Sequence, residues 1–86
     1  MTEQEARPAP LDPLEAAVHV LGEEGGSLHW TVIQDLALRR GYLDPFVQRD
    51  VRKLLLAALA EGVRSGVLEK EAGDAKGVYR LPSETS

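Results

Sequence analysis

Four polar and basic side chains close together in the chain have the clearest chemical potential: Gln48, Arg49, Arg52 and Lys53. Arginine and lysine neutralise phosphates, and arginine and glutamine also form hydrogen bonds with the edges of bases. Their spacing places them in the first two turns of an expected helix, where a DNA-reading helix makes its contacts. These four residues are therefore the candidate DNA-binding residues, together with Lys76 and Arg80 nearer the end of the chain.

The same expected helix also offers a site for a protein partner. Leu56 and Ala60 are predicted near the centre of its outer face, between Arg49, Lys53 and Arg64. An exposed leucine there suits a groove that binds a helix, or a contact between two copies of the chain. The plainer interpretations are a solvated basic face and a scattered surface leucine.

Catalytic and metal sites are not expected. The only histidines, His19 and His29, lie on different expected elements, whereas a metal needs three or four converging ligands. His29 is instead expected to cap or pack against the helix that follows it. The sequence has no Cys and no strained nucleophile turn such as GxSxG. We therefore expect no enzyme activity, no cofactor and no bound metal.

The size and charge of the chain limit the function further. Its 86 residues have room for one domain with a single core. The net charge of −4 argues against a general nucleic-acid binder. However, residues 1–24 contain six acidic side chains and one basic one, whereas residues 25–80 contain nine basic and seven acidic ones. The absence of Cys and of a long apolar run predicts a cytoplasmic protein without a membrane span or secretory signal.

A single domain is expected over residues 12–82, between a flexible acidic tail at 1–11 and a second tail at 83–86. Asp12 followed by Pro13 starts its first helix, which should end at Gly22. Thr31 is expected to cap the second helix, residues 32–40, and Gly41 to terminate it.

The third helix is the longest expected element. Asp44 and Pro45 form its start signal, and the pattern continues to Gly66. Its apolar residues recur every three or four positions and form one stripe that should face the core: Val47, Val51, Leu54, Leu55, Ala58 and Leu59. Gly62 lies inside the helix at a cost of about 1 kcal/mol relative to Ala, so we expect the last turn to fray.

Short strands complete the expected fold. Residues 67–71 and 77–81 are predicted to form a hairpin with a loop at 72–76, and a short extended stretch precedes the second helix. Alternation along the last strand points Tyr79 inward. Three helices closed by a two- or three-stranded sheet describe a winged helix-turn-helix, mainly α with a small antiparallel β wing, whose third helix reads the major groove.

The segment from Ala16 to Leu43, AAVHVLGEEGGSLHWTVIQDLALRRGYL, resembles the HARE-HTH family. The resemblance lies in an Ala-rich first helix ending in Val-Leu, the Leu-His-aromatic turn at residues 28–30, and a second helix closing on Gly41. The ending at residues 77–81 extends it. The family includes the N-terminal domain of the RNA polymerase delta subunit. More distantly, residues 51–81 are similar in layout to the last helix and wing of the linker histone globular domain.

The resemblance implies a module without catalytic activity that binds DNA or docks on nucleic-acid machinery. We expect moderate, salt-dependent binding of double-stranded DNA, in transcription regulation or a related DNA transaction. The alternative is a protein-interaction module that docks on RNA polymerase or another partner without reading DNA. A homodimer of the winged helix is also left open.

Overall fold

The computed structural model describes residues 10–71 and 76–82. This part of the chain forms the helices α1 (Pro13–Glu24), α2 (Trp30–Arg39) and α3 (Val51–Ser65), and the strands β1 (Leu28–His29), β2 (Glu69–Lys70) and β3 (Val78–Arg80). The predicted order of elements is confirmed. Residues 1–9 and 83–86 of the predicted tails, and residues 72–75 of the predicted hairpin loop, lie outside the described residues.

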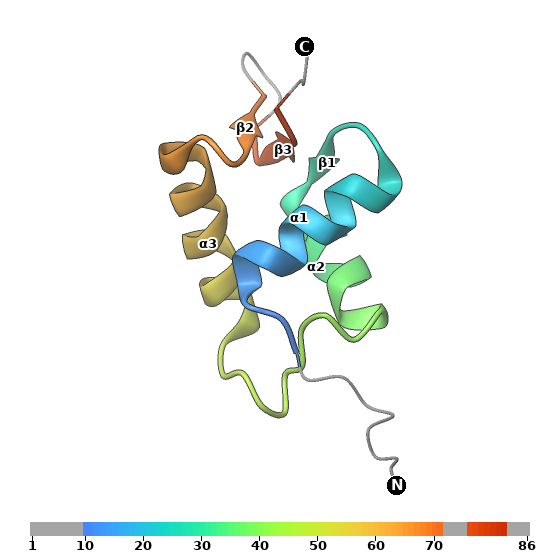
Figure 1. Cartoon of the computed structure of the whole chain (residues 1–86). Helices are drawn as coiled ribbons and strands as arrows, with labels where there is room; N and C mark the ends of the chain where they lie inside the picture. The colour runs from blue at the N-terminus through green and yellow to red at the C-terminus, as the bar shows by residue number, and fades with distance from the viewer. Residues whose placement is uncertain (1–9, 72–75, 83–86) are drawn as a thin grey trace, which may run out of the picture.

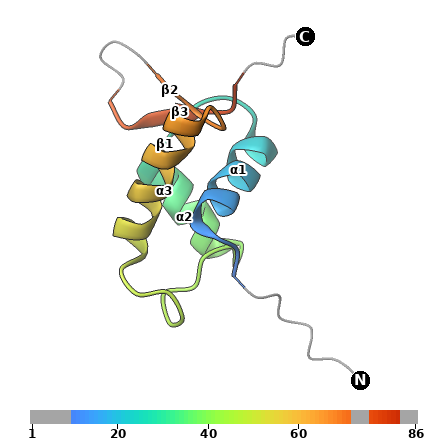
Figure 2. The same ribbon diagram turned by 60° about the vertical axis from the view of Figure 1, so that its left-hand side comes forward.

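The strands form one antiparallel sheet in the order β1-β3-β2. Tyr79 on the central strand is opposite Leu28 on one side and Lys70 on the other, and it is buried, as predicted. Figures 1 and 2 agree that the sheet lies at one end of the molecule and the connection between α2 and α3 at the other. Three helices with a small antiparallel sheet at one end form a winged-helix layout.

The start of α1 is built as predicted. Pro13 occupies the first turn, and the Asp12 carboxylate accepts a hydrogen bond from the Leu14 N–H over 3.1 Å. The helix continues past its predicted end at Gly22 to Glu24. It packs against both other helices around an apolar core made of Ala16, Ala17, Val20, Leu21, Ile33, Ala37, Leu43, Leu55, Leu59, Leu68 and Tyr79.

The second helix begins earlier than predicted because a different residue caps it. His29 is the N-cap, and its Nδ1 accepts a hydrogen bond from the Thr31 N–H over 3.2 Å. Thr31, the predicted cap, therefore lies inside the helix. The capping role predicted for His29 is confirmed. The backbone N–H of Trp30 donates to the Gly77 carbonyl over 2.8 Å, which joins the start of α2 to the sheet.

The predicted start of the third helix at Pro45 is wrong. Asp44 does act as a cap, since its Oδ1 accepts from the Phe46 N–H over 2.9 Å, but only one turn of chain follows. Asp50 then adopts a left-handed conformation with φ 53°, and α3 begins at Val51. A non-glycine residue with positive φ interrupts a right-handed helix, so the Asp44 turn and α3 are separate.

The buried stripe of α3 is also rotated relative to the prediction. Leu55 and Leu59 are buried as expected, but Val47 lies outside the helix with 67% of its surface exposed, and Leu54 is 40% exposed. Leu56, predicted to be exposed on the outer face, is half-buried and packs against the core. The later start removes Val47 from the helix, and the inward positions of α3 are centred on Val51, Leu55, Leu59 and Gly62.

Gly62 is a buried position of α3 that lies against both α1 and the chain entering β2. A Cβ atom at this position would lie 2.8 Å from Leu14 Cδ1 and 2.8 Å from Leu68 Cδ1. The Gly62 carbonyl accepts hydrogen bonds from the N–H groups of Val67, over 2.8 Å, and Leu68, over 3.0 Å. The helix continues past this glycine to Ser65, and the fraying expected of its last turn stays a prediction.

A polar cluster joins the ends of α1 and α2. Arg40 forms ion pairs with Glu23 and Glu24, each over 2.6 Å, and the Tyr42 hydroxyl donates a hydrogen bond to Glu23. The hydrogen bond from Tyr42, with the charge of Arg40, lowers the pKa of Glu23. The same hydrogen bond raises the pKa of Tyr42. The cluster is therefore strongest when Glu23 is ionised and Tyr42 is neutral.

Replacing Gly62 by alanine should destabilise the protein, although alanine is the better helix former. The methyl group would overlap Leu14 and Leu68, and overpacking of a tight core costs about 1–3 kcal/mol, more than the gain of about 1 kcal/mol in helix propensity. Urea unfolding of Gly62→Ala would measure the effect. Ala60→Gly, at an exposed position of the same helix, is the control for propensity alone. An unchanged or raised unfolding free energy for Gly62→Ala would contradict the packing argument.

Replacing Tyr42 by phenylalanine should raise the pKa of Glu23, because its main stabilising hydrogen bond is lost. A carboxyl whose pKa is lowered by folding stabilises the folded state above its unfolded pKa, and this contribution disappears as the pH falls through the lowered pKa. Tyr42→Phe should therefore destabilise the protein near neutral pH and match the original chain in acid. An NMR titration of the Glu23 side chain measures the shift directly. Arg39→Gln, which removes an ion pair with Asp35, should leave the Glu23 titration unchanged.

Candidate nucleic-acid interface

Arg52 is positioned at the junction of two helices. It lies in the first turn of α3, and its guanidinium carbon is 5.5 Å from the centre of the Trp30 ring, at the start of α2. A guanidinium over an indole face is held by a cation–π interaction, which keeps the charge at the surface without neutralising it. Lys53 follows directly, and both residues line a shallow hollow of about 270 Å³ with Asp50 and Leu56.

The base of the wing, at Gly77, also lies against Trp30. Gly77 has φ 74°, and a Cβ atom there would lie 3.0 Å from His29 Nε2 and 3.0 Å from Trp30 Cδ1. The wing backbone therefore lies directly against the Trp30 side chain, which also contacts Arg52. Lys76, the exposed residue before Gly77, adds a positive charge at this edge. Thus Arg52 of α3 and the base of the wing both approach Trp30, and the structure brings together the predicted residues Arg52 and Lys53 in one hollow, which Lys76 does not line.

Gln48 and Arg49 lie in the connection before α3, not in the helix. The Gln48 side chain is used internally: its Oε1 accepts from the Asp44 N–H over 2.8 Å, and its Nε2 donates to the Leu11 carbonyl over 3.2 Å. Leu11, assigned to the tail by the sequence, is thereby fixed to the domain. Arg49 is exposed beside Asp50. Of these two predicted residues, Arg49 has the side chain that is free to meet a ligand.

The Arg80 side chain is engaged in ion pairs at the sheet. Its guanidinium forms ion pairs with Glu69, over 2.8 Å, and Glu71, over 3.1 Å, and the Ser27 hydroxyl donates to Glu71 over 2.6 Å. The hydrogen bond to Glu69 is the main reason that the pKa of Arg80 is raised. Two carboxylates against one guanidinium leave this cluster on β2 and β3 slightly acidic. Arg80 therefore sits in a different electrostatic environment from Arg52.

The charges of the described residues divide into two groups. Arg39, Arg40, Arg64 and Arg80 are all paired with carboxylates. Arg49, Arg52 and Lys53 form no ion pair with another residue in the described ranges 10–71 and 76–82, and Asp50 is the one carboxylate that shares their hollow. Lys70 and Lys76 also form no ion pair with another described residue, so three of the five unpaired cations lie around the start of α3 and two lie on or beside the sheet.

The alternative protein site predicted on α3 is not assembled as expected. Leu56 packs against the core and Arg64 is paired with Glu61, while Ala60 is exposed. The most exposed apolar side chain in the described part of the chain is Phe46, at 97%, in the turn held by Asp44.

Sequence reasoning missed two of the residues that shape these surfaces. Trp30 entered the sequence analysis only as the aromatic residue of the turn at residues 28–30, and Phe46 was placed inside a helix. No pattern in the sequence signals the contact between Trp30 and Arg52, because it joins residues far apart in the chain. The positive φ of Asp50, which releases Phe46 from α3, has a weak signal at best, since aspartate tolerates this conformation better than most residues do.

Other site types find little support in the part of the chain that is described. None of its helices is long and apolar enough to cross a membrane, and no three of its His, Asp or Glu side chains gather as metal ligands would.

Comparisons of the chain with protein-family models, with curated proteins and with solved structures find no match. The candidate interface therefore rests on the geometry and charge of its own residues.

Proposed function

We propose that this chain is a winged-helix module that binds double-stranded DNA through the start of α3 and the base of the wing. The observation that carries the proposal is the division of charges: among the described residues the other arginines are paired, while Arg49, Arg52 and Lys53 are not. In a winged helix the positions of Arg52 and Lys53 belong to the element that enters the major groove, and Arg49 lies just before that element. The resemblance to HARE-HTH modules favours a role in transcription regulation or a related DNA transaction.

Each residue has a definite task in this proposal. Arg52, oriented by Trp30, is placed to contact the groove or a phosphate, and Lys53 and Arg49 neutralise neighbouring phosphates. Lys76 contacts the flanking backbone from the wing. Gln48 and Arg80 are left out, because their polar groups already have partners within the fold. With few contacts on an acidic protein, affinity should be moderate and strongly dependent on salt.

Neutralising Arg52 and Lys53 should reduce the salt dependence of DNA binding. Each lost phosphate contact lowers the slope of log K against log salt by about one unit, so Arg52→Gln/Lys53→Gln should lower it by about two. Fluorescence anisotropy with a labelled duplex of mixed sequence, from about 50 to 200 mM salt, measures the slope.

The control for net charge is Arg39→Gln/Arg64→Gln, which removes the same charge from paired positions. It should lower the slope much less. If the original chain does not bind DNA at about 50 mM salt, or if both double variants lose the same amount, the proposal is wrong.

A second candidate function, docking on a protein such as RNA polymerase, is favoured by one observation. Phe46 is almost completely exposed on a turn fixed by hydrogen bonds to Asp44, and exposed, rigid aromatic side chains are typical anchors of protein interfaces. Co-elution with purified RNA polymerase that is lost in Phe46→Ala and kept in Arg52→Gln/Lys53→Gln would favour docking. The opposite pattern would favour the DNA proposal.

A further inference from the structure

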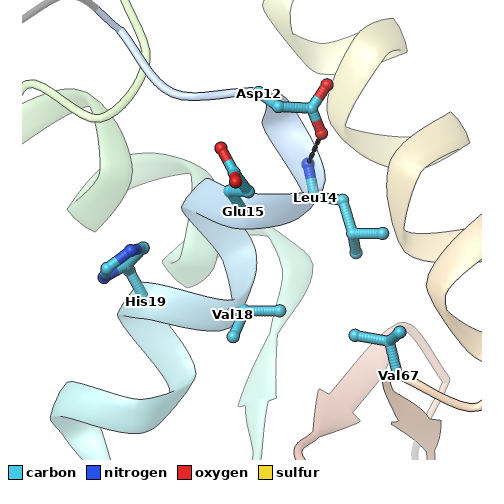
Figure 3. Close-up of a pocket in the computed structure, with 6 residues that line it drawn as sticks. All are labelled: Asp12, Leu14, Glu15, Val18, His19 and Val67. Atoms are coloured by element: carbon cyan, nitrogen blue, oxygen red, sulfur yellow. Dashed lines mark hydrogen bonds between the residues drawn. The ribbon is translucent and has the colours of Figure 1, made fainter.

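A hollow of about 360 Å³ lies between α1 and the turn that follows α3. Leu14 and Val18 line it from α1, and Val67 lines it from the turn (Figure 3). Val67 keeps 41% of its surface exposed, although it is an apolar residue. The size is at the lower end of the range of ligand sites, which is enough for one apolar side chain.

The walls of this hollow are held in place before any ligand arrives. The Val67 N–H donates to the Gly62 carbonyl over 2.8 Å, so the turn is closed against the helix end. Leu14 packs directly on Gly62, where a Cβ atom would be only 2.8 Å from its Cδ1. A pre-formed site loses little conformational entropy on binding, which favours even a small ligand.

The rim of the hollow is acidic. Asp12 and Glu15 line it together with His19, and no Lys or Arg of the described residues does so. The Asp12 carboxylate accepts one hydrogen bond, from Leu14, and Glu15 forms no ion pair with another described residue. Both carboxylates are therefore available to a cationic ligand. Except for these acidic groups and His19, the lining is apolar.

We propose that this hollow binds a short basic peptide segment of a partner protein, which inserts one aliphatic side chain between Leu14, Val18 and Val67. Lysine or arginine residues beside that side chain contact Asp12 and Glu15. The apolar walls supply the anchor, and the opposite charges select the partner and speed its approach. A single anchor supports only weak binding, with a dissociation constant of about 0.1–1 mM.

This site differs from the candidate nucleic-acid interface in both elements and charge. It is built by α1 and the turn that follows α3, whereas Arg52 and Lys53 lie at the start of α3, where Arg52 contacts Trp30 of α2. The two surfaces can therefore be tested separately, and failure of DNA binding would not affect this proposal.

A titration monitored by two-dimensional amide NMR tests the site with three synthetic peptides, each blocked at both ends. The first has a leucine between pairs of lysines, the second has alanine in place of the leucine, and the third has glutamates in place of the lysines. We expect the first peptide to shift the amide signals of Leu14, Val18 and Val67 at millimolar concentration. The second and third should bind at least about tenfold more weakly, because each lacks either the apolar anchor or the opposite charge.

Variants of the protein test the same contacts from the other side. Glu15→Gln should weaken the first peptide about threefold by removing one exposed charge contact, and Glu61→Gln, an equal change on α3, should not. Val67→Lys should abolish binding by placing a cation in the hollow. Val32→Lys is the matched control, because Val32 on α2 is exposed to the same extent, 41%.

Three results would overturn the proposal. The first is the absence of localised shifts with the lysine–leucine peptide, and the second is equal binding of the alanine or glutamate peptide. The third is a set of shifts at Leu14, Val18 and Val67 that grows with protein concentration alone, which would make a second copy of the chain the occupant.

Discussion

The missing side chain at Gly62 is the constraint on which the rest of this fold depends. It allows Leu14 of α1 and Leu68 of the chain entering β2 to pack against the same point of α3. Its carbonyl then turns the chain by accepting the N–H groups of Val67 and Leu68. One position therefore sets the distance between two helices, the exit of α3 and the placement of the sheet. Leu14, which packs on this glycine, also lines the hollow between α1 and the turn after α3.

The sequence predicted those parts of the fold that local chemistry decides. Asp12 with Pro13 started a helix, Gly41 adopted the left-handed conformation expected of a terminator, with φ 79°, and Tyr79 pointed into the core. In each case the determining atoms lie within a few residues of one another. The order of helices and strands, and with it the winged-helix layout, followed from these local signals.

The errors came where distant residues compete with local preference. Asp44 and Pro45 form a valid helix start, but Gln48 bonds back to Asp44 and across to Leu11, and Asp50 leaves the helical region of backbone conformation. Therefore α3 begins later and Phe46 lies outside it, and Leu56 packs against the core instead of lying on the outer face. The candidate interface was predicted in part, since Arg52 and Lys53 lie on α3 as expected. Arg80 was predicted to contact DNA, but it pairs with Glu69, and that ion pair follows from a strand register that the sequence does not specify.

The distribution of charge explains how an acidic chain can carry a local basic surface. Four of the nine cations among the described residues are paired with carboxylates, as Arg40 is with Glu23 and Glu24. Fields of exposed charges fade over about 8–10 Å in physiological salt, so the uncompensated group at the start of α3 acts largely by itself. Net charge is therefore a poor guide to what a small domain of this kind attracts at close range.

The shortness of the sheet has a consequence for how these molecules behave at high concentration. The outer strands, β1 and β2, are two residues long each, and Glu69, beside its partner Arg80, occupies one of them. An exposed strand edge is a template for unwanted pairing between molecules, and natural proteins blunt it by shortening the strand and adding charge. At β2 the strand is short and carries charge, so edge-to-edge aggregation through this strand is disfavoured.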